Sequence, residues 1–283
     1  MSAGHATSAR RLEVGGVGLN VLDEGEGPPV LLLHGFPDSL DLWRHQVPAL
    51  TGAGFRVIAP DLRGFGRSDA PEEVEAYALP AVMEDVVGLL DQLEVPTTHV
   101  VGHDWGAALA WGLAALQPDR VERLVALSVG HPATFPGSME QRALSWYMLF
   151  FLFPEAEEAL QRDDWRLFRE AFGGGGDLDR YVEDLSRPGR LTAGLNWYRA
   201  NISPESFASA MSSAVPAVSC PTLGVWSAGD IALTEHQMTS SAENVTGPWR
   251  YERIDDASHW MPVDAPERLN ELLLDFLAGE EPR

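Results

Sequence analysis

The first half of the chain alternates short apolar runs with longer segments in which apolar positions recur at helical spacing. Such short runs, rich in β-branched residues and leucine, are typical of a mostly parallel sheet covered by helices. Gly15-Gly16 separates the first two runs as a tight turn, which predicts an antiparallel pair. Helices are predicted at Pro80–Leu93 and Trp105–Leu116. The predicted strands are Arg11–Val14, Val17–Leu22, Val30–Leu33, Arg56–Ala59, Thr98–Val101 and Val121–Ser128.

The strand pattern stops at about Pro132 and returns only after Pro216. Between these points aromatic and charged residues gather at helical spacing, which indicates an inserted helical cap. The run Gly173–Gly176 interrupts it. No strand precedes this run and no Lys-Ser/Thr follows it, so it predicts a mobile loop rather than a phosphate-binding loop. We expect a core at 1–131 and 216–283 and a cap at 132–215, with late core elements at Thr222–Trp226, Trp249–Ile254 and the helix Pro266–Leu277.

The composition and net charge of the chain argue against some classes of binding partner. The chain has 283 residues, 45% of them hydrophobic, enough for a sizeable core. Its 42 acidic and 20 basic residues give a formal net charge of −22, so it lacks a basic surface for phosphate backbones or anionic membranes. Neither nucleic acid nor a membrane is expected as a partner. A lone cysteine, Cys220, excludes an intrachain disulfide, and Met1–Arg11 lacks the apolar core of a signal peptide, so a cytoplasmic protein is expected.

The segment Val101-Gly102-His103-Asp104-Trp105-Gly106 has the Gly-x-x-x-Gly frame of a nucleophile elbow, with an aspartate where serine is usual. In such an elbow the nucleophile is on a strained turn between a strand and a helix, and the flanking glycines permit that turn. A carboxylate at this position needs no base to remove a proton first. Asp104 is therefore expected to form a covalent ester by displacing a leaving group from a saturated carbon.

An ester on Asp104 has to be hydrolysed, which calls for a histidine to activate water and an acid to orient it. Asp230 follows the predicted strand Thr222–Trp226, and His259 follows the predicted strand Trp249–Ile254. The order nucleophile, acid, histidine is that of the α/β-hydrolase fold. Asp230 also fits a simple turn, because Gly-Asp pairs are common in turns. The presence of the other two members favours the catalytic interpretation.

Attack of water on the ester carbonyl creates an oxyanion, which needs two backbone donors. One is the amide of Trp105, directly after the nucleophile. The other is expected from the loop His34–Asp38, where Phe36 supplies its amide and Pro37 fixes the turn. His34 lies beside this donor loop, which favours a structural hydrogen-bonding role over that of a catalytic base.

These motifs resemble those of the α/β-hydrolase-fold epoxide hydrolases, in particular the soluble, single-domain bacterial type, and the match runs through nearly the whole chain. The loop His34-Gly35-Phe36-Pro37 is similar to the family's His-Gly-x-Pro, and Gly102–Gly106 is similar to its Gly-x-Asp-Trp-Gly elbow. His131-Pro132, where the cap begins, is also typical of the family. The resemblance implies an α/β-hydrolase fold with a mostly parallel, eight-stranded sheet covered by helices and an inserted helical cap.

The same resemblance implies a pair of cap tyrosines that bind the epoxide oxygen and protonate the departing alkoxide. Tyr147 matches the first, and Tyr198, in Asn196-Trp197-Tyr198-Arg199, matches the second; Tyr181 is the reserve candidate. An acid is needed because an alkoxide is a poor leaving group. The alternative is that these tyrosines only pack, with their hydroxyls at a wet edge.

The implied reaction converts an epoxide to a vicinal diol, with His259 and Asp230 hydrolysing the ester of Asp104, and calls for no metal or organic cofactor. The apolar run Ala143–Pro154 is too short to span a bilayer and predicts a buried helix or a pocket wall. A small hydrophobic or aryl-substituted epoxide is expected as substrate, and the protein as a monomer or homodimer. The residues expected to line the pocket are Phe36, Trp105, Trp146, Phe150, Phe151 and Trp197.

Two other functions compete with this one. A haloalkane dehalogenase uses the same aspartate, histidine and acid, but the residue after His-Gly in that family is usually an asparagine that binds halide, and here it is Phe36. Trp105 is compatible with either enzyme. A ligand-binding homologue without activity is the second alternative, because fold alone does not imply catalysis. The complete set of nucleophile, acid, histidine and donor loop argues against it.

Overall fold

A single sheet organises the molecule. The computed structural model describes residues 9–135, 138–208 and 215–279. Its eight strands run in the order β1-β2-β4-β3-β5-β6-β7-β8, with β2 antiparallel to β1 and β4 and the other pairs parallel. Both the number of strands and their mostly parallel arrangement agree with the prediction. The strands are β1 (Arg10–Val14), β2 (Val17–Glu24), β3 (Pro29–Leu33), β4 (Arg56–Pro60), β5 (Thr98–His103), β6 (Val121–Leu127), β7 (Thr222–Gly229) and β8 (Trp249–Ser258).

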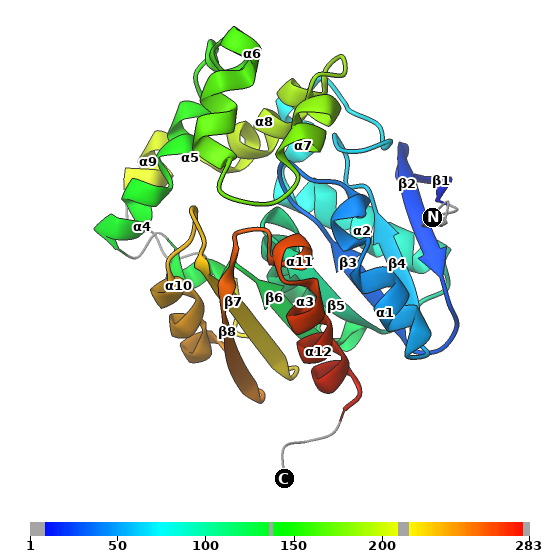
Figure 1. Ribbon diagram of the computed structural model, residues 1–283. Coiled ribbons are helices and arrows are strands. Elements are labelled where there is room, and N and C mark those ends of the chain that lie inside the picture. Colours follow the sequence, from blue (N-terminus) through cyan, green and yellow to red (C-terminus); the bar gives the residue numbers. More distant parts are fainter. Residues whose placement is uncertain (1–8, 136–137, 209–214, 280–283) are drawn as a thin grey trace, which may run out of the picture.

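Helices cover both faces of the sheet, which is why the central strands are apolar without alternation. Leu32 in β3, Val101 in β5 and Val125 in β6 have no exposed surface. One pair of helices packs together in front of the sheet in Figure 1, and α3 lies behind it, where it packs against α2. The front pair is α1 (Gln46–Gly52) and α12 (Pro266–Leu277), and the second pair is α2 (Leu79–Gln92) and α3 (Trp105–Leu116).

The cap lies between β6 and β7 in sequence and contains only helices among its described residues. Figure 1 shows it as a layer over the ends of the strands. The backbone of α6 leaves helical geometry at Arg162–Trp165, which divides that helix into two parts. The cap helices are α4 (Met139–Leu144), α5 (Trp146–Phe150), α6 (Ala156–Phe172), α7 (Leu178–Leu185), α8 (Arg190–Asn201) and α9 (Pro204–Ala208).

The loops that follow β3, β5, β7 and β8 open at one edge of the sheet, directly beneath the cap, because the carboxyl ends of parallel strands share an edge. The loop after β7 leads into α10 (Glu235–Thr239), and the loop after β8 leads into α11 (Met261–Asp264). The fold thus brings residues from both parts of the core to one place.

The main difference from the predicted elements is in the last two strands. They were expected to end at Trp226 and Ile254, where the apolar pattern stops, but β7 and β8 continue to Gly229 and Ser258. Pairing of Gly229 with Ser258 extends the sheet there, and hydrogen bonds between backbones do not depend on apolar side chains. The strands therefore end directly before Asp230 and His259.

The limits of the described residues bear on two predictions. Most of the N-terminal segment examined for a signal peptide lies in residues 1–8, outside the described residues. The cap helices lie within the predicted range 132–215, of which 136–137 and 209–214 are also outside the described residues. In the described part of the chain, no helix combines the length and the apolar character that crossing a membrane requires.

Candidate active site

Asp104 sits at the turn between β5 and α3, where its backbone has φ 54° and ψ −123°, a strained conformation for a residue with a side chain. The turn is possible because its neighbours are glycines. A Cβ on Gly106 would lie 2.0 Å from the carbonyl oxygen of Leu33, and one on Gly102 would lie 2.3 Å from that of Gly106. This geometry holds the Asp104 carboxylate at the base of the cap.

The loop after β3 approaches the Asp104 carboxylate closely. The amide of Phe36 donates a hydrogen bond of 2.8 Å to Oδ1 of Asp104, and the Phe36–Pro37 peptide is cis. A Cβ on Gly35 would lie 2.6 Å from the amide nitrogen of Trp105, so only glycine permits this approach. The amides of Phe36 and Trp105 are thus both beside the carboxylate.

His34 holds this loop in place. Its Nε2 accepts a hydrogen bond of 3.0 Å from the amide of Leu62, which leaves Nδ1 as the donor to the carbonyl of Gly35, also at 3.0 Å. Burial lowers the pKa of His34, so the ring is neutral. The structural role predicted for His34 agrees with these contacts.

Asp230 and His259 meet across the ends of β7 and β8. Both carboxylate oxygens of Asp230 lie 3.1 Å from Nδ1 of His259, and Nε2 of His259 lies 3.7 Å from Oδ2 of Asp104. The amides of Ala232 and Leu233 each donate to Oδ1 of Asp230 at 2.9 Å. The structure therefore brings together the three side chains that the sequence placed in one triad.

Charge around His259 controls its protonation. Burial by itself lowers the pKa of His259, but the carboxylates of Asp230 and Asp104 outweigh burial and raise that pKa to about 10. Burial by itself raises the pKa of Asp230, and the His259 cation together with the hydrogen bonds to the carboxylate lowers it below its ordinary value. At neutral pH the site accordingly holds an imidazolium between two carboxylates.

Three polar side chains that sequence reasoning did not include hold the loop of His259. The Nε2–H of His103 donates to the carbonyl of His259 at 2.8 Å, and the hydroxyl of Ser128 donates to the same oxygen at 3.2 Å. The hydroxyl of Ser227 donates to the carbonyl of Ser258 at 2.6 Å. Burial lowers the pKa of His103 to about 4, so it stays a neutral donor. The position of His103 within the elbow was the only sequence signal for this role.

Tyr147 on α5 and Tyr198 on α8 face the nucleophile from the cap. Both line a cavity of about 180 Å³ that also contains Asp104, and both line a smaller adjoining space that contains His259. Their rings are 5.9 Å apart. Burial raises the pKa of each tyrosine well above its usual range, and the charge of Asp104 raises it further, so both hydroxyls keep their protons. The two tyrosines are thus neutral hydrogen-bond donors that line the same cavity as the carboxylate of Asp104.

The reserve candidate lies elsewhere in the cap. Tyr181, on α7, is buried and packs against Trp260 with ring centroids 5.5 Å apart. It lines neither of the two spaces that contain Asp104. The geometry therefore favours Tyr147 over Tyr181 as the partner of Tyr198.

The expected pocket residues divide into three groups. Trp105 lines the larger of the two spaces around Asp104, and Phe36 lines the smaller one. Trp146 differs from the prediction, because it is 46% exposed on the outer face of α5 and lines neither space. The remaining three pack behind the lining and support it: Phe150, Phe151 and Trp197. Apolar lining that sequence reasoning missed comes from Ala108, Val129, Phe135, Met148, Ile202 and Leu233.

Metal ions in proteins are usually bound by clustered histidine, cysteine, aspartate and glutamate side chains. Among the described residues, histidine, cysteine, aspartate and glutamate side chains do not gather into a group of three or more that could hold a metal ion.

Comparison with known proteins agrees with this geometry. A model of the α/β-hydrolase fold family matches residues 28–266. Epoxide hydrolase A of Mycobacterium tuberculosis is 35% identical, with 98% of this chain and 99% of that protein covered, and an α/β-hydrolase superfamily protein of Bacillus subtilis is 34% identical, with 94% and 96% covered. The crystal structure of epoxide hydrolase A from Mycobacterium thermoresistibile superposes with a TM-score of 0.83 at 34% identity, covering 98% of this chain and 99% of that one. The chain therefore belongs to the α/β-hydrolase family, among its epoxide hydrolases.

Proposed function

We propose that the protein hydrolyses epoxides to vicinal diols in two steps, with Asp104 as the nucleophile. One observation carries the proposal: a single carboxylate faces two neutral phenols on one side and an imidazole on the other. Asp104, Tyr147 and Tyr198 line both adjoining spaces, and His259 lines the smaller one. A reaction that needs an acid first and a base afterwards suits this arrangement.

In the first step, a carboxylate oxygen of Asp104 bonds to an epoxide carbon and the carbon–oxygen bond of the ring breaks. The hydroxyls of Tyr147 and Tyr198 donate to the epoxide oxygen, which becomes a hydroxyl group. The high pKa of both phenols supports this role, because they reach the reaction protonated. The product of the step is an ester of Asp104.

Ester formation changes the state of His259. It removes the negative charge of Asp104, which is one of the two carboxylates that raise the pKa of His259 to about 10. The pKa of His259 therefore falls after the first step, and the imidazolium releases a proton. The tyrosine that gave its proton to the epoxide oxygen takes up this proton and becomes a neutral phenol again, so the site needs no outside acid.

In the second step, neutral His259 takes a proton from water, and the hydroxide attacks the ester carbonyl of Asp104. The amides of Phe36 and Trp105 lie beside this carboxyl group and would stabilise the oxyanion. When the ester breaks, the diol leaves with the second proton of the water. His259 is again a cation held by Asp230, and Asp104 is again a carboxylate.

The cavity supports a small hydrophobic epoxide as the substrate. Its walls are mostly apolar, and its volume is about 180 Å³, so an aryl or alkyl substituent would find matching surface there. Because Cys220 is the single cysteine, the chain cannot form an intrachain disulfide, which supports action in a reducing, cytoplasmic environment.

The first test compares leaving groups. The protein is incubated with styrene oxide and, separately, with a bromoalkane of similar size, and diol and bromide are measured. We expect diol and no appreciable bromide. Bromide without diol would assign the site to dehalogenation instead, and neither product would favour a binding protein without activity.

The second test follows the ester. In a single turnover in ¹⁸O-labelled water, attack on the ester carbonyl places the label in the carboxylate of Asp104, and mass analysis of the peptide that contains it detects the label. Direct attack of water on the epoxide would leave Asp104 unlabelled and place all of the label in the diol. That outcome would contradict the covalent mechanism while leaving the activity in place.

A further inference from the structure

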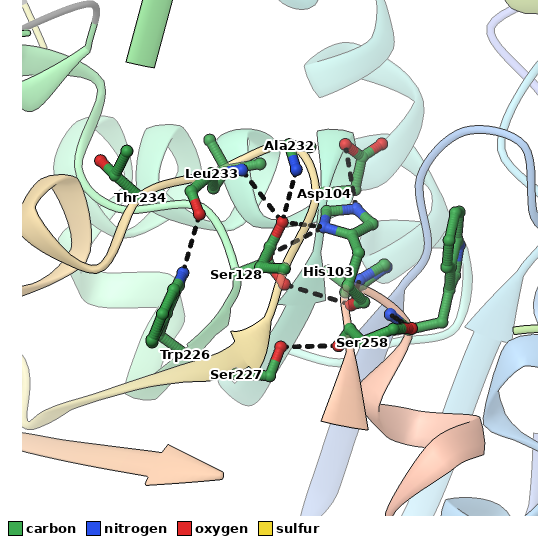
Figure 2. A network of polar contacts seen from close by, with 12 residues as sticks. His103, Asp104, Ser128, Trp226, Ser227, Ala232, Leu233, Thr234 and Ser258 are labelled. Atoms are coloured by element: carbon green, nitrogen blue, oxygen red, sulfur yellow. Dashed lines mark hydrogen bonds and ion pairs between the residues drawn. The ribbon is translucent and has the colours of Figure 1, made fainter. Parts of the chain in front are cut away.

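The orientation of the Asp230 carboxylate depends on the short loop that follows it. The amides of Ala232 and Leu233 both donate to Oδ1 of Asp230, so any shift of these two peptide groups moves the carboxylate relative to His259. Figure 2 shows Ala232, Leu233 and Thr234 along this loop. What holds this loop therefore also holds the acid of the triad.

One brace comes from the core. The Nε1–H of Trp226, in β7, donates to the carbonyl of Leu233 at 2.9 Å (Figure 2). This bond fixes the outer side of the loop against the strand from which it emerges. It leaves the carbonyl of Ala232 and the amide of Thr234 without a partner in the core, although both residues are buried.

Those two groups are bound by a glutamine of the cap. Gln141, in α4, is 1% exposed, and its amide nitrogen donates to the carbonyl of Ala232 at 2.8 Å. Its side-chain oxygen accepts from the amide of Thr234 at 2.9 Å and from the hydroxyl of Thr234 at 3.1 Å. The second N–H donates to Ser145 at 3.0 Å. The side chain thus uses both donors and both acceptor sites of its amide group.

We propose that Gln141 is a positioning residue for ester hydrolysis, which it serves by holding the Asp230 loop in register with His259. This inference rests on the proposed function. Gln141 does not touch the reacting atoms. It binds the peptide groups on both sides of Leu233, and the first of these groups contains the Leu233 amide that donates to Asp230. The cap therefore contributes to the second step as well as supplying the tyrosines of the first.

Ring opening should depend much less on Gln141. Tyr147 is held by aromatic packing, with its ring centroid 5.6 Å from that of Phe151 and 5.7 Å from that of Phe172. Removing the Gln141 amide does not alter these contacts, whereas it leaves the buried carbonyl of Ala232 and the amide of Thr234 unsatisfied, and the loop has to shift to reach other partners. The rate of ring opening should therefore depend on the aromatic packing of Tyr147, and the rate of ester decay on the hydrogen bonds of Gln141.

The decisive variant is Gln141→Met, which has a similar length and helix propensity and no hydrogen-bonding amide. Single turnovers with styrene oxide are quenched at intervals, and the mass of the intact protein gives the rates at which the ester forms and decays. We expect ester decay to slow by about tenfold and ester formation to change by less than about twofold. The ester should then accumulate during steady-state turnover.

The pH dependence of the ester decay rate tests the positioning role, because a residue that only stabilised the fold would not change this dependence. Asp230 raises the pKa of His259, so a displaced Asp230 lowers it. In Gln141→Met the rate of ester decay should reach its alkaline plateau at a lower pH than in the wild type. A profile with an unshifted midpoint would contradict the positioning role.

Two further variants separate the interaction from the stability of the helix. Ser138→Ala removes the hydroxyl that caps α4 by accepting from the amide of Gln141 at 3.1 Å, but it leaves the glutamine side chain in place, so ester decay should be unchanged. Thr234→Val removes only one of the bonds to Gln141, keeps the protein folded if Gln141→Met fails to fold, and should slow ester decay by about threefold.

Equal slowing of both steps, or unchanged kinetics with a lower melting temperature, would overturn the inference and make Gln141 a docking residue of the cap. Ester decay slowed as strongly in Ser138→Ala would have the same meaning. If the wild-type protein forms diol without any ester on Asp104, the proposed mechanism itself is wrong, and that result appears in the wild-type trace before any variant is compared.

Discussion

The cavity around Asp104 has a core wall, which carries Asp104 and His259, and a cap wall, which carries Tyr147 and Tyr198. Different forces hold the reactive groups of the two walls. On the core side, hydrogen bonds fix each charged group: the Phe36 amide fixes Asp104, and the amides of Ala232 and Leu233 fix Asp230. On the cap side, aromatic rings hold the neutral Tyr198, with Phe151 at 4.9 Å and Trp105 at 5.1 Å between centroids. A buried charge needs hydrogen bonds, whereas a phenol can be placed by packing.

This difference gives the two walls different roles in the proposed reaction. Under the proposed mechanism, the core wall changes charge during turnover, because Asp104 becomes an ester and His259 loses and regains a proton. The cap wall donates a proton to the epoxide oxygen, and its phenols are neutral again before the ester is hydrolysed. Mutations on the two walls should therefore fail in distinguishable ways, and the comparison can be tested from the strongest expected effect to the weakest.

The largest effect is expected for Asp104→Asn. The amide has nearly the same shape as the carboxylate but cannot form the ester, so diol formation should fall by about 10⁴-fold or more, as for the loss of a covalent nucleophile in other hydrolases. Diol release measured with styrene oxide tests this, and circular dichroism checks the fold. A loss of less than tenfold would mean that the core wall does not supply the nucleophile.

His259→Gln should separate the two steps. Ester formation continues, because Asp104 needs no base, but ester decay should slow by about 10³-fold, within the range for a general base. Intact-protein mass measured after mixing with substrate should show the ester as the main species. A variant that neither forms the ester nor releases diol would place His259 in the first step and remove the division between the walls.

Tyr198→Phe and Tyr147→Phe test the cap wall. Each should slow ester formation by about 10- to 100-fold and leave ester decay within about twofold, because the hydroxyl acts only on the epoxide oxygen. The ring remains, so the aromatic packing and the melting temperature should change little. Equal effects on both steps would count against the acid role of the tyrosine concerned.

The charged core wall should also make stability depend on pH. The pKa of His259 is raised from an ordinary 6.5 to about 10, so its contribution to the free energy of unfolding is complete below pH 6.5 and is lost as pH rises to about 10. The chain has no lysine to titrate in this window. Urea unfolding at pH 6.5, 8 and 9.5 should show this loss in the wild type and a smaller loss in His259→Gln. If the free energy of unfolding fell equally with pH in the wild type and in His259→Gln, His259 would not be held as a cation.

The smallest effect is expected for Trp146→Ala. The indole is 46% exposed and lines neither space around Asp104, so diol formation should stay within about twofold and the free energy of unfolding within about 1 kcal/mol. Steady-state kinetics and urea unfolding provide both values. A strong loss of activity would restore the predicted pocket role of Trp146 and extend the cap wall to the outer face of α5.

Sequence reasoning worked best where the chemistry depends on neighbouring residues. Asp104 and its flanking glycines form one turn, and Asp230 and His259 each follow a strand, so local patterns were enough to propose the three residues, which the structure brings together. The mistaken expectation for Trp146 has a simple geometric cause. Adjacent residues of a helix point about 100° apart, so when Tyr147 faces the cavity its neighbour faces away.

Contacts between distant segments were beyond the sequence. Gln141 lies 91 residues before Ala232, and His103 lies 156 residues before His259, and nothing in either local pattern indicates the partner. A glutamine in a helix usually faces water, so its burial was not expected. Only the packed structure shows that this amide meets the two buried backbone groups of the acid loop.

The sequence by itself determined the order of strands and helices and the helical segment inserted between them, and it predicted Asp104, Asp230 and His259 as nucleophile, acid and histidine, because periodicity and short motifs depend on local backbone geometry. Only the tertiary structure revealed the two carboxylates that surround His259, the distance of Tyr181 from the spaces around Asp104 and the bonds between Gln141 and the loop after Asp230. These depend on distances and burial, since charges and hydrogen bonds act through space between residues that the chain keeps far apart.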